Sequence, residues 1–122
     1  MDGYEQQADL LKALAHPIRL QILDILNESE SCVCHLTTIL KQRQPYVSQQ
    51  LMILREAGLV LDRKEGVIVY YRLADQHLVA LMESAREMLR ATGVQVERAA
   101  IPVAPVSGCP CPKCNPSASK VT

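Results

Sequence analysis

The sequence lacks the largest apolar side chains and any long apolar run. Its 122 residues include no phenylalanine, no tryptophan and only four tyrosines. The core must therefore be built from Leu, Ile, Val, Ala and Met, which suits a helical domain. No apolar stretch is long enough to cross a bilayer, and the first residues, Met1 to Glu5, are acidic where a secretion signal would be basic. The sequence therefore predicts a cytoplasmic protein without a membrane partner.

The net charge is zero, but the charged residues are unevenly distributed along the chain. The 13 basic and 13 acidic side chains cancel. Residues 1–40 carry six acids and two bases, whereas residues 41–73 carry six bases and three acids. The neutral total therefore conceals a basic middle segment.

The chain divides into one folded domain, residues 1–93, and a C-terminal tail, residues 94–122. About ninety residues are enough for a single small core. The tail has no helical or strand period, and five of the seven prolines of the chain lie in it, at positions 102, 105, 110, 112 and 116. We therefore expect an extended, flexible segment that contains cysteines.

Apolar spacing predicts three helices before residue 41. Leu10, Leu11 and Leu14 are expected to face inward from the first helix. Pro17 breaks that helix and opens the second one. The three helices cover residues 4–15, 17–27 and about 32–40.

A fourth helix forms the second half of a helix-turn-helix. Pro45 marks its first turn and Gly58 its end, and Val47, Leu51 and Leu54 form its buried stripe. The other face is polar and able to bond base edges in a major groove, as the second helix of a helix-turn-helix does. The residues of this helix that we predict to contact DNA are Gln44, Tyr46, Ser48, Gln49 and Gln50.

Two segments rich in β-branched and aromatic residues follow and predict a hairpin. They are residues 60–64 and 67–73, separated by Glu65 and Gly66. We place Arg63 and Lys64 at the tip, where they would meet phosphate or a minor groove as the wing of a winged helix. The alternative is that these two charges are simply solvated.

The apolar surface of the last predicted helix is the reason to expect a dimer. It starts at Asp75, a good N-cap, and continues to about Thr92, with Gly93 as its stop. Its apolar positions cover more surface than one small core needs, which favours a homodimer whose two recognition helices read a pair of half-sites. The alternative is that they only cover the domain's own core. These positions are Leu78, Val79, Leu81, Met82, Ala85, Met88 and Leu89.

Five cysteines fall in two clusters that predict one soft-metal site. Cys32 and Cys34 flank a valine near a helix start, where the helix dipole favours thiolate, the form that binds metal. Residues two apart on an ideal helix point to nearly opposite sides, so we expect the first turn to distort when both sulfurs bind one ion. The metal ligands that we predict are Cys32, Cys34, Cys109, Cys111 and Cys114.

Other uses of the cysteines stay open. Buried cysteine often serves only as a small apolar residue, and a thiol pair can sense oxidants or persulfide. Cys111 and Cys114 have the C-x-x-C spacing of dithiol enzymes, without the βαβ context of such enzymes. A protein that buffers metal and binds no DNA is a further alternative, which the polar helix face and the basic hairpin disfavour.

Taken in order along the chain, the predicted helices, the cysteine pair and the hairpin closely resemble the ArsR-type (ArsR/SmtB) family of metal-responsive bacterial repressors. The resemblance implies a winged helix-turn-helix protein, mainly α with a small β-hairpin, that is no enzyme and forms a homodimer through its first and last helices. Such a repressor binds double-stranded operator DNA when metal-free and dissociates on binding its inducer. The resemblance covers about residues 8–92 and is carried by residues 11–19, 32–36, 47–51, 54–60 and 66–73.

The resemblance also concerns the inducer. The Cys-Val-Cys box resembles the sensing site of arsenic, antimony, cadmium and lead responders, which implies arsenite or antimonite, or Cd(II), Pb(II) or Zn(II). Many arsenic sensors carry a third cysteine where this chain has Thr37, so the tail cysteines are the candidates for further ligands. Other members bind zinc between their last helices; this chain keeps Asp75 and His77 of that pattern but has Met88 and Ala91 in place of the remaining ligands.

Overall fold

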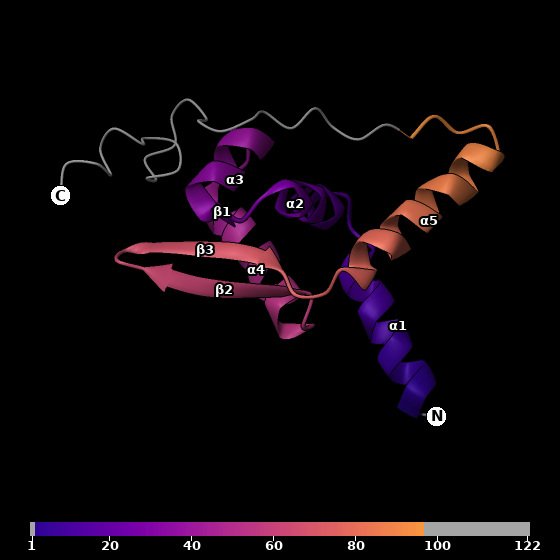
Figure 1. Ribbon diagram of the computed structural model, residues 1–122, viewed down its shortest axis with the longest axis horizontal. Coiled ribbons are helices and arrows are strands. Elements are labelled where there is room, and N and C mark those ends of the chain that lie inside the picture. Colours follow the sequence, from indigo (N-terminus) through magenta and orange to yellow (C-terminus); the bar gives the residue numbers. More distant parts are fainter. Residues whose placement is uncertain (1, 97–122) are drawn as a thin grey trace.

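The structure is a computed structural model that describes residues 2–96; Met1 and residues 97–122 lie outside the described part. Five helices and three strands follow one another within it (Figure 1). The expected fold, mainly α with a small antiparallel sheet, is confirmed. No helix of this part is long and apolar enough to span a membrane. The elements are α1 (Asp2–Leu14), α2 (Pro17–Glu28), β1 (Ser31–Cys32), α3 (Val33–Leu40), α4 (Gln44–Glu56), β2 (Val60–Glu65), β3 (Ile68–Leu73) and α5 (His77–Ala91).

Local chemistry determines where the helices begin and end. The His16 ring nitrogen Nδ1 accepts a hydrogen bond from the Ile18 N–H at 3.3 Å, and Pro17 occupies the first turn of α2, where no N–H is needed. Lys41 ends α3 in the left-handed conformation, with φ 54°. Gly93, with φ 89°, follows α5 as the predicted stop.

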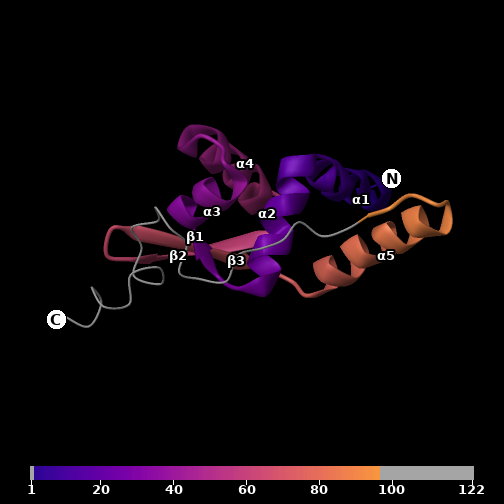
Figure 2. The same ribbon diagram turned by 90° about the horizontal axis from the view of Figure 1, so that it is seen from above.

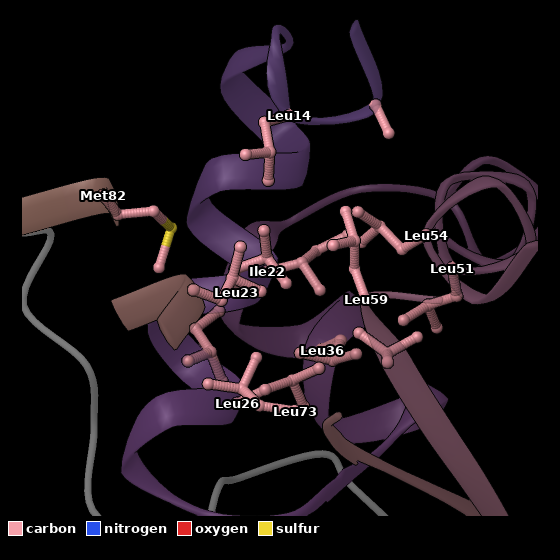
Figure 3. Close-up of a cluster of buried hydrophobic side chains, with 14 of the residues drawn as sticks. Leu14, Ile22, Leu23, Leu26, Leu36, Leu51, Leu54, Leu59, Leu73 and Met82 are labelled. Atoms are coloured by element: carbon pink, nitrogen blue, oxygen red, sulfur yellow. The ribbon is translucent and has the colours of Figure 1, made fainter. Parts of the chain in front are cut away.

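The core forms where α2, α3 and α4 meet (Figure 3). The buried stripe predicted on α4 is confirmed, because Val47, Leu51 and Leu54 have no exposed surface. Leu36 of α3 is equally buried, so the two halves of the helix-turn-helix share one core. Met82 joins this cluster from α5.

The sheet has the order β1-β3-β2, and β3 pairs with both neighbours in antiparallel register. Ser31 pairs with Tyr71 and Cys32 with Tyr70. The sequence did not predict β1, because two residues are too few to show an alternating pattern. Figures 1 and 2 show the β2–β3 hairpin projecting away from α1 and α5. This hairpin is the wing of a winged helix-turn-helix.

One prediction for α1 is wrong. Leu14 is buried and Leu10 packs on the core, but Leu11 is 46% exposed. Leu11 instead lines an open groove of about 440 Å³ between α1, α2 and α5. Leu81 and Leu89 of α5 line the same groove and are also exposed. The excess of apolar surface predicted on α5 is therefore present, and it continues onto α1.

Candidate DNA interface and thiol site

The helix-turn-helix presents the polar face of α4. Because α3 and α4 pack through their apolar sides, the opposite side of α4 faces outward. Gln44 and Gln49 are exposed, while Tyr46 and Ser48 are partly buried. These four predicted side chains lie on this face or at its edge, where the second helix of a helix-turn-helix meets the major groove.

Gln50 requires a correction. The sequence predicts it on the outer face, but its side chain is only 6% exposed, and its Oε1 atom has no hydrogen-bond partner among the described residues. The helical period explains this, because residue 50 lies three positions after Val47 and four before Leu54, both on the buried stripe. Gln50 therefore belongs to the inner side of α4, away from the reading face.

The hairpin tip also differs from the predicted one. Gly66 and Val67 form a two-residue loop, in which Gly66 has a φ of 62°. The tip centres on Gly66 because glycine adopts this conformation without strain. Lys64 lies in the second residue pair from the loop and is exposed, and Arg63 lies in the third. Neither charge is at the tip itself.

Arg63 is held by acidic partners. Its Nη2 donates to one Glu30 oxygen at 2.6 Å, and its Nε donates to both Glu30 oxygens at 3.0 and 2.9 Å. Its Nη1 donates to Glu65 at 2.7 Å, and its guanidinium lies 4.7 Å from the centre of the Tyr70 ring. The hydrogen bonds with Glu30 and then with Glu65 raise the pKa of Arg63. A DNA phosphate would therefore compete with these two carboxylates for this side chain.

The thiols of the first cysteine cluster meet at the junction of β1 and α3. Cys32 has extended backbone (φ −86°, ψ 166°) and is the N-cap of α3, whereas Cys34 lies in the first turn. Because Cys32 precedes the helix, both sulfurs reach one place, and their Sγ atoms are 2.6 Å apart. Cys32 already lies outside helical geometry, so the sulfurs meet in this structure without distortion of α3. The expected distortion of the first turn on ion binding stays a prediction.

The two thiols have different surroundings. Cys32 is 1% exposed, and its sulfur accepts a hydrogen bond from the His35 N–H at 3.4 Å. Cys34 is partly exposed and offers the approach from solvent. The hydroxyls of Thr37 and Thr38 both donate to the Cys34 carbonyl, at 2.8 and 2.9 Å. Thr37, which stands in place of the third cysteine, thus contacts the backbone of Cys34 one turn along α3.

The described chain supplies two soft donors of a metal site. A structural zinc site, for comparison, has four protein ligands. Within residues 2–96, no group of three or more His, Cys, Asp or Glu side chains is arranged to hold a metal ion. The other predicted ligands, Cys109, Cys111 and Cys114, lie outside the described residues. The Cys32/Cys34 pair would need such additional ligands to complete a site.

Asp75 and His77 contact each other at the start of α5. The Asp75 carboxylate accepts a hydrogen bond from the His77 N–H at 2.9 Å and lies 2.7 Å from the His77 ring nitrogen Nδ1. These two hydrogen bonds, the backbone one first, lower the pKa of Asp75. The N-cap of α5 is Gln76, whose side chain makes no capping hydrogen bond, so the predicted N-cap at Asp75 is one residue off. Asp75 instead binds the backbone N–H of His77, the first residue of α5.

Glu30 and Tyr70 are parts of this region that the sequence patterns did not indicate. Glu30 reaches Arg63 from the segment between α2 and β1, 33 residues earlier in the chain, and Tyr70 reaches it from the neighbouring strand of the hairpin. Neither helical period nor strand alternation reveals such a contact. Pairing Cys32 with Tyr70 in a third strand would have indicated Tyr70, but the two residues of β1 carry too little signal for that.

The fold and the site together define a winged helix-turn-helix DNA-binding regulator with a pair of thiols at the start of its helix-turn-helix. A family model described as bacterial regulatory protein, arsR family, matches residues 16–61, which include α2, α3, all of α4 and the start of β2. The chain belongs to the ArsR/SmtB family of transcriptional repressors. Members of this family are DNA-binding regulators and not enzymes.

Individual relatives support this placement. The chain is 40% identical over 90 residues to a transcriptional repressor SmtB homolog of Synechocystis sp., covering 74% of this chain and 68% of the relative. It is 53% identical over 66 residues to the arsenical resistance operon repressor of Escherichia coli, covering 53% and 56%. The solution structure of a homodimeric winged helix-turn-helix DNA-binding domain from Mycobacterium bovis is 33% identical, with a TM-score of 0.66 and coverage of 77% of this chain and 89% of that one.

Proposed function

We propose that this protein is a metal(loid)-responsive repressor that binds operator DNA when metal-free and dissociates when a thiophilic inducer engages its cysteines. The observation that carries the proposal is the Cys32/Cys34 pair, whose sulfurs lie together at the start of the helix that supports α4. The similarity to an arsenical resistance operon repressor favours arsenite or antimonite. Cd(II), Pb(II) and Zn(II) are alternative inducers, because soft thiolate ligands select such ions over hard ones.

Cys109, Cys111 and Cys114 are the proposed source of the remaining ligands. Three thiolates suffice for As(III), which requires one tail cysteine beside Cys32 and Cys34, whereas four-coordinate ions require two. The tail of either subunit of a homodimer is a possible donor. In this proposal the tail is therefore part of the sensor, although it lies outside residues 16–61, which the family model matches.

Ligand geometry links the thiol pair to the DNA-binding elements. Two sulfurs about 2.3 Å from a tetrahedral ion are about 3.8 Å apart. The neighbouring sulfurs of Cys32 and Cys34 can reach this spacing through adjustments of the two residues and of the first turn of α3. Because Cys32 is at once a residue of β1 and the N-cap of α3, its displacement acts on the sheet and on the helix-turn-helix together.

The DNA-bound form is proposed as a homodimer. A second copy would cover the groove that Leu11 and Leu89 line, and would place two α4 helices about one DNA turn apart. Gln44, Tyr46, Ser48 and Gln49 are the proposed contacts in the major groove, and Lys64 of the wing the proposed phosphate contact. Arg63, also predicted to touch DNA, would contribute only where phosphate competes successfully with its two carboxylate partners.

A titration of reduced protein on fluorescent operator DNA tests this function. The DNA comes from upstream of the protein's own gene, and As(III), Cd(II), Pb(II) and Zn(II) are added anaerobically to the full chain and to a chain truncated after Gly93. We expect at least one ion to release the DNA and truncation to weaken that release. The full chain with Cys32→Ser is the matched control, because it keeps the tail thiols and should stay on DNA. Release by none of the four ions would reject metal sensing.

Thiol-redox or persulfide sensing by the same repressor is the second candidate. The 2.6 Å separation of the Cys32 and Cys34 sulfurs favours it, because two neighbouring thiols can be oxidised to a disulfide or bridged by further sulfur. In the same assay, DNA release by a persulfide or a peroxide, reversed by added dithiol and independent of metal, would identify this function.

A further inference from the structure

A row of three side chains crosses the sheet from the thiol pair to the wing. Cys32 of β1 pairs with Tyr70 of β3, and Tyr70 pairs with Arg63 of β2. Residues directly opposite each other in antiparallel strands project from the same face of a sheet. Cys32 and Tyr70 pack together in one buried cluster, and the Arg63 guanidinium covers the Tyr70 ring at 4.7 Å. Tyr70 thus touches both the thiol pair and the wing cation.

Glu30 makes a second connection between the same two places. It lies between α2 and β1, two residues before Cys32, and its carboxylate accepts three hydrogen bonds from Arg63. Glu65 also accepts a hydrogen bond from Arg63, but it belongs to the same hairpin as Arg63. Of these two carboxylates, only that of Glu30 joins the wing to the segment that carries the thiol.

We propose that Glu30 and Tyr70 are positioning residues that couple the Cys32/Cys34 pair to the orientation of the wing. This inference rests on the metal-responsive function proposed above. With the two sulfurs together, the Glu30–Arg63 ion pair and the Arg63–Tyr70 stack hold the hairpin in the orientation that binds DNA. When Cys32 is displaced, the adjoining residue Glu30 moves with it, and Arg63 loses its anchor. The wing then takes part in release by a route that bypasses α3 and α4.

The ion pair has properties that suit such coupling. Glu30 is 22% exposed and Arg63 47% exposed, so the pair contributes little to the stability of the fold. Replacement of Glu30 by glutamine removes the charge but keeps the size of the side chain, and folding should be preserved. A weak contact can couple two sites when it forms in only one of the two states. Linked sites typically change each other's affinity by about 5–150-fold.

The experiment measures the response ratio, defined as the Kd for operator DNA with Cd(II) divided by the Kd without it, for the full chain at one salt concentration. Glu30→Gln should lower this ratio by up to about fivefold per subunit, which is the most that one exposed ion pair contributes. Glu65→Gln is the matched control: it removes the carboxylate on the hairpin side of Arg63 and should keep the wild-type ratio. The cadmium-thiolate absorbance and the melting temperature of both variants should equal those of the wild type. A purely structural role of Glu30 would instead lower the melting temperature.

A double-mutant cycle completes the test. Arg63→Gln should lower the response ratio at least as much as Glu30→Gln, because it removes the stack on Tyr70 as well as the ion pair. The double variant should lower the ratio no further than Arg63→Gln alone, because the ion pair is then already lost. A wild-type ratio in Glu30→Gln, an equal loss in Glu65→Gln, or additive losses in the double variant would each overturn the coupling role while leaving the repressor function standing. If the wild-type protein stays on DNA in Cd(II), the same ratio is measured with As(III), Pb(II) and Zn(II). A wild-type protein that stays on DNA in all four ions would overturn the proposed function, and the coupling role with it.

Discussion

A third cysteine on α3 should make the tail cysteines dispensable. Serine at positions 109, 111 and 114 leaves Cys32 and Cys34 as the only thiols of this five-cysteine chain. In that background, Thr37→Cys adds a thiol one helical turn after Cys34, where Cβ atoms three residues apart are about 5–6 Å from each other. This spacing places the new thiol on the same side of α3 as Cys34. The Thr37 hydroxyl now donates to the Cys34 carbonyl at 2.8 Å.

The expected magnitudes follow from ligand number and from the lost hydrogen bond. Four ligands hold structural zinc with about 10–16 kcal/mol, about 3 kcal/mol for each ligand, so losing one thiolate should weaken inducer binding roughly 100-fold. Thr37→Cys should restore most of this loss for As(III), which needs three thiolates. The substitution removes the Thr37 hydrogen bond, at a cost of about 1 kcal/mol in stability. The Thr38 hydroxyl still bonds the same carbonyl, at 2.9 Å.

The assay is the As(III) concentration that releases half of the operator DNA under anaerobic conditions. The tail-serine protein should require about 100-fold more As(III) than the wild type, and the protein with Thr37→Cys should return to near the wild-type concentration. Thr37→Ser in the same background is the control, since it keeps a hydroxyl and adds no thiol. A tail-serine protein with a wild-type response would refute the role of the tail. Failure of Thr37→Cys to restore the response would show that α3 does not orient residue 37 toward the pair.

Four further predictions concern the thiols, the reading face, the sheet and the core. Cys34→Ser should keep DNA binding but abolish release by metal in the same titration; surviving release would make the pair structural. Gln49→Ala should weaken specific DNA binding by about 1–3 kcal/mol and spare non-specific binding, and an unchanged specificity ratio would move the reading face elsewhere. Burial, followed by the charge of Asp62, raises the pKa of Tyr71, so the folded pKa exceeds the unfolded value of about 10. This contribution to stability is complete below about pH 10 and is lost as pH rises through the folded pKa; Tyr71→Phe should therefore show a smaller alkaline fall in melting temperature, and an identical fall would contradict the burial argument. Leu51→Ala should cost about 2–5 kcal/mol in urea unfolding, because Leu51 is fully buried; a smaller cost would mean that the core collapses around the gap.

Helices with an apolar period could be predicted well from the sequence, because burial on one side repeats every three to four residues. The stripe of Val47, Leu51 and Leu54 is an example, and its inner side proved fully buried. The same period explains the error at Gln50, where a polar side chain occupies a position that the period assigns to the inner side. At this position the helical period, and not the polarity of the residue, determines that the side chain is buried.

Contacts that depend on strand register could not be predicted in the same way. Arg63 was placed at an open tip from its charge and its nearness to Gly66, but its partner Glu30 lies 33 residues earlier in the chain. The meeting of the two sulfurs was also missed, because it depends on Cys32 being the extended N-cap of α3 and not a residue of the helix. The position of Glu30, just before β1, and the extended backbone of Cys32 both depend on β1, a strand of two residues. A strand this short is specified by its partner β3 and hardly at all by its own side chains.

The position of Cys32 explains how a small displacement could release DNA. A side-chain N-cap contributes about 1 kcal/mol, and an exposed ion pair such as Glu30–Arg63 about 0.2–1 kcal/mol. Cys32 caps α3 and adjoins the segment of Glu30, so separating the sulfurs can weaken both contacts at once. Their sum falls within the 1–3 kcal/mol typical of allosteric coupling. In a homodimer the same loss occurs twice on one operator. Two weak contacts per subunit are therefore sufficient for regulation, and neither the core of Leu36 and Leu51 nor α4 itself has to unfold.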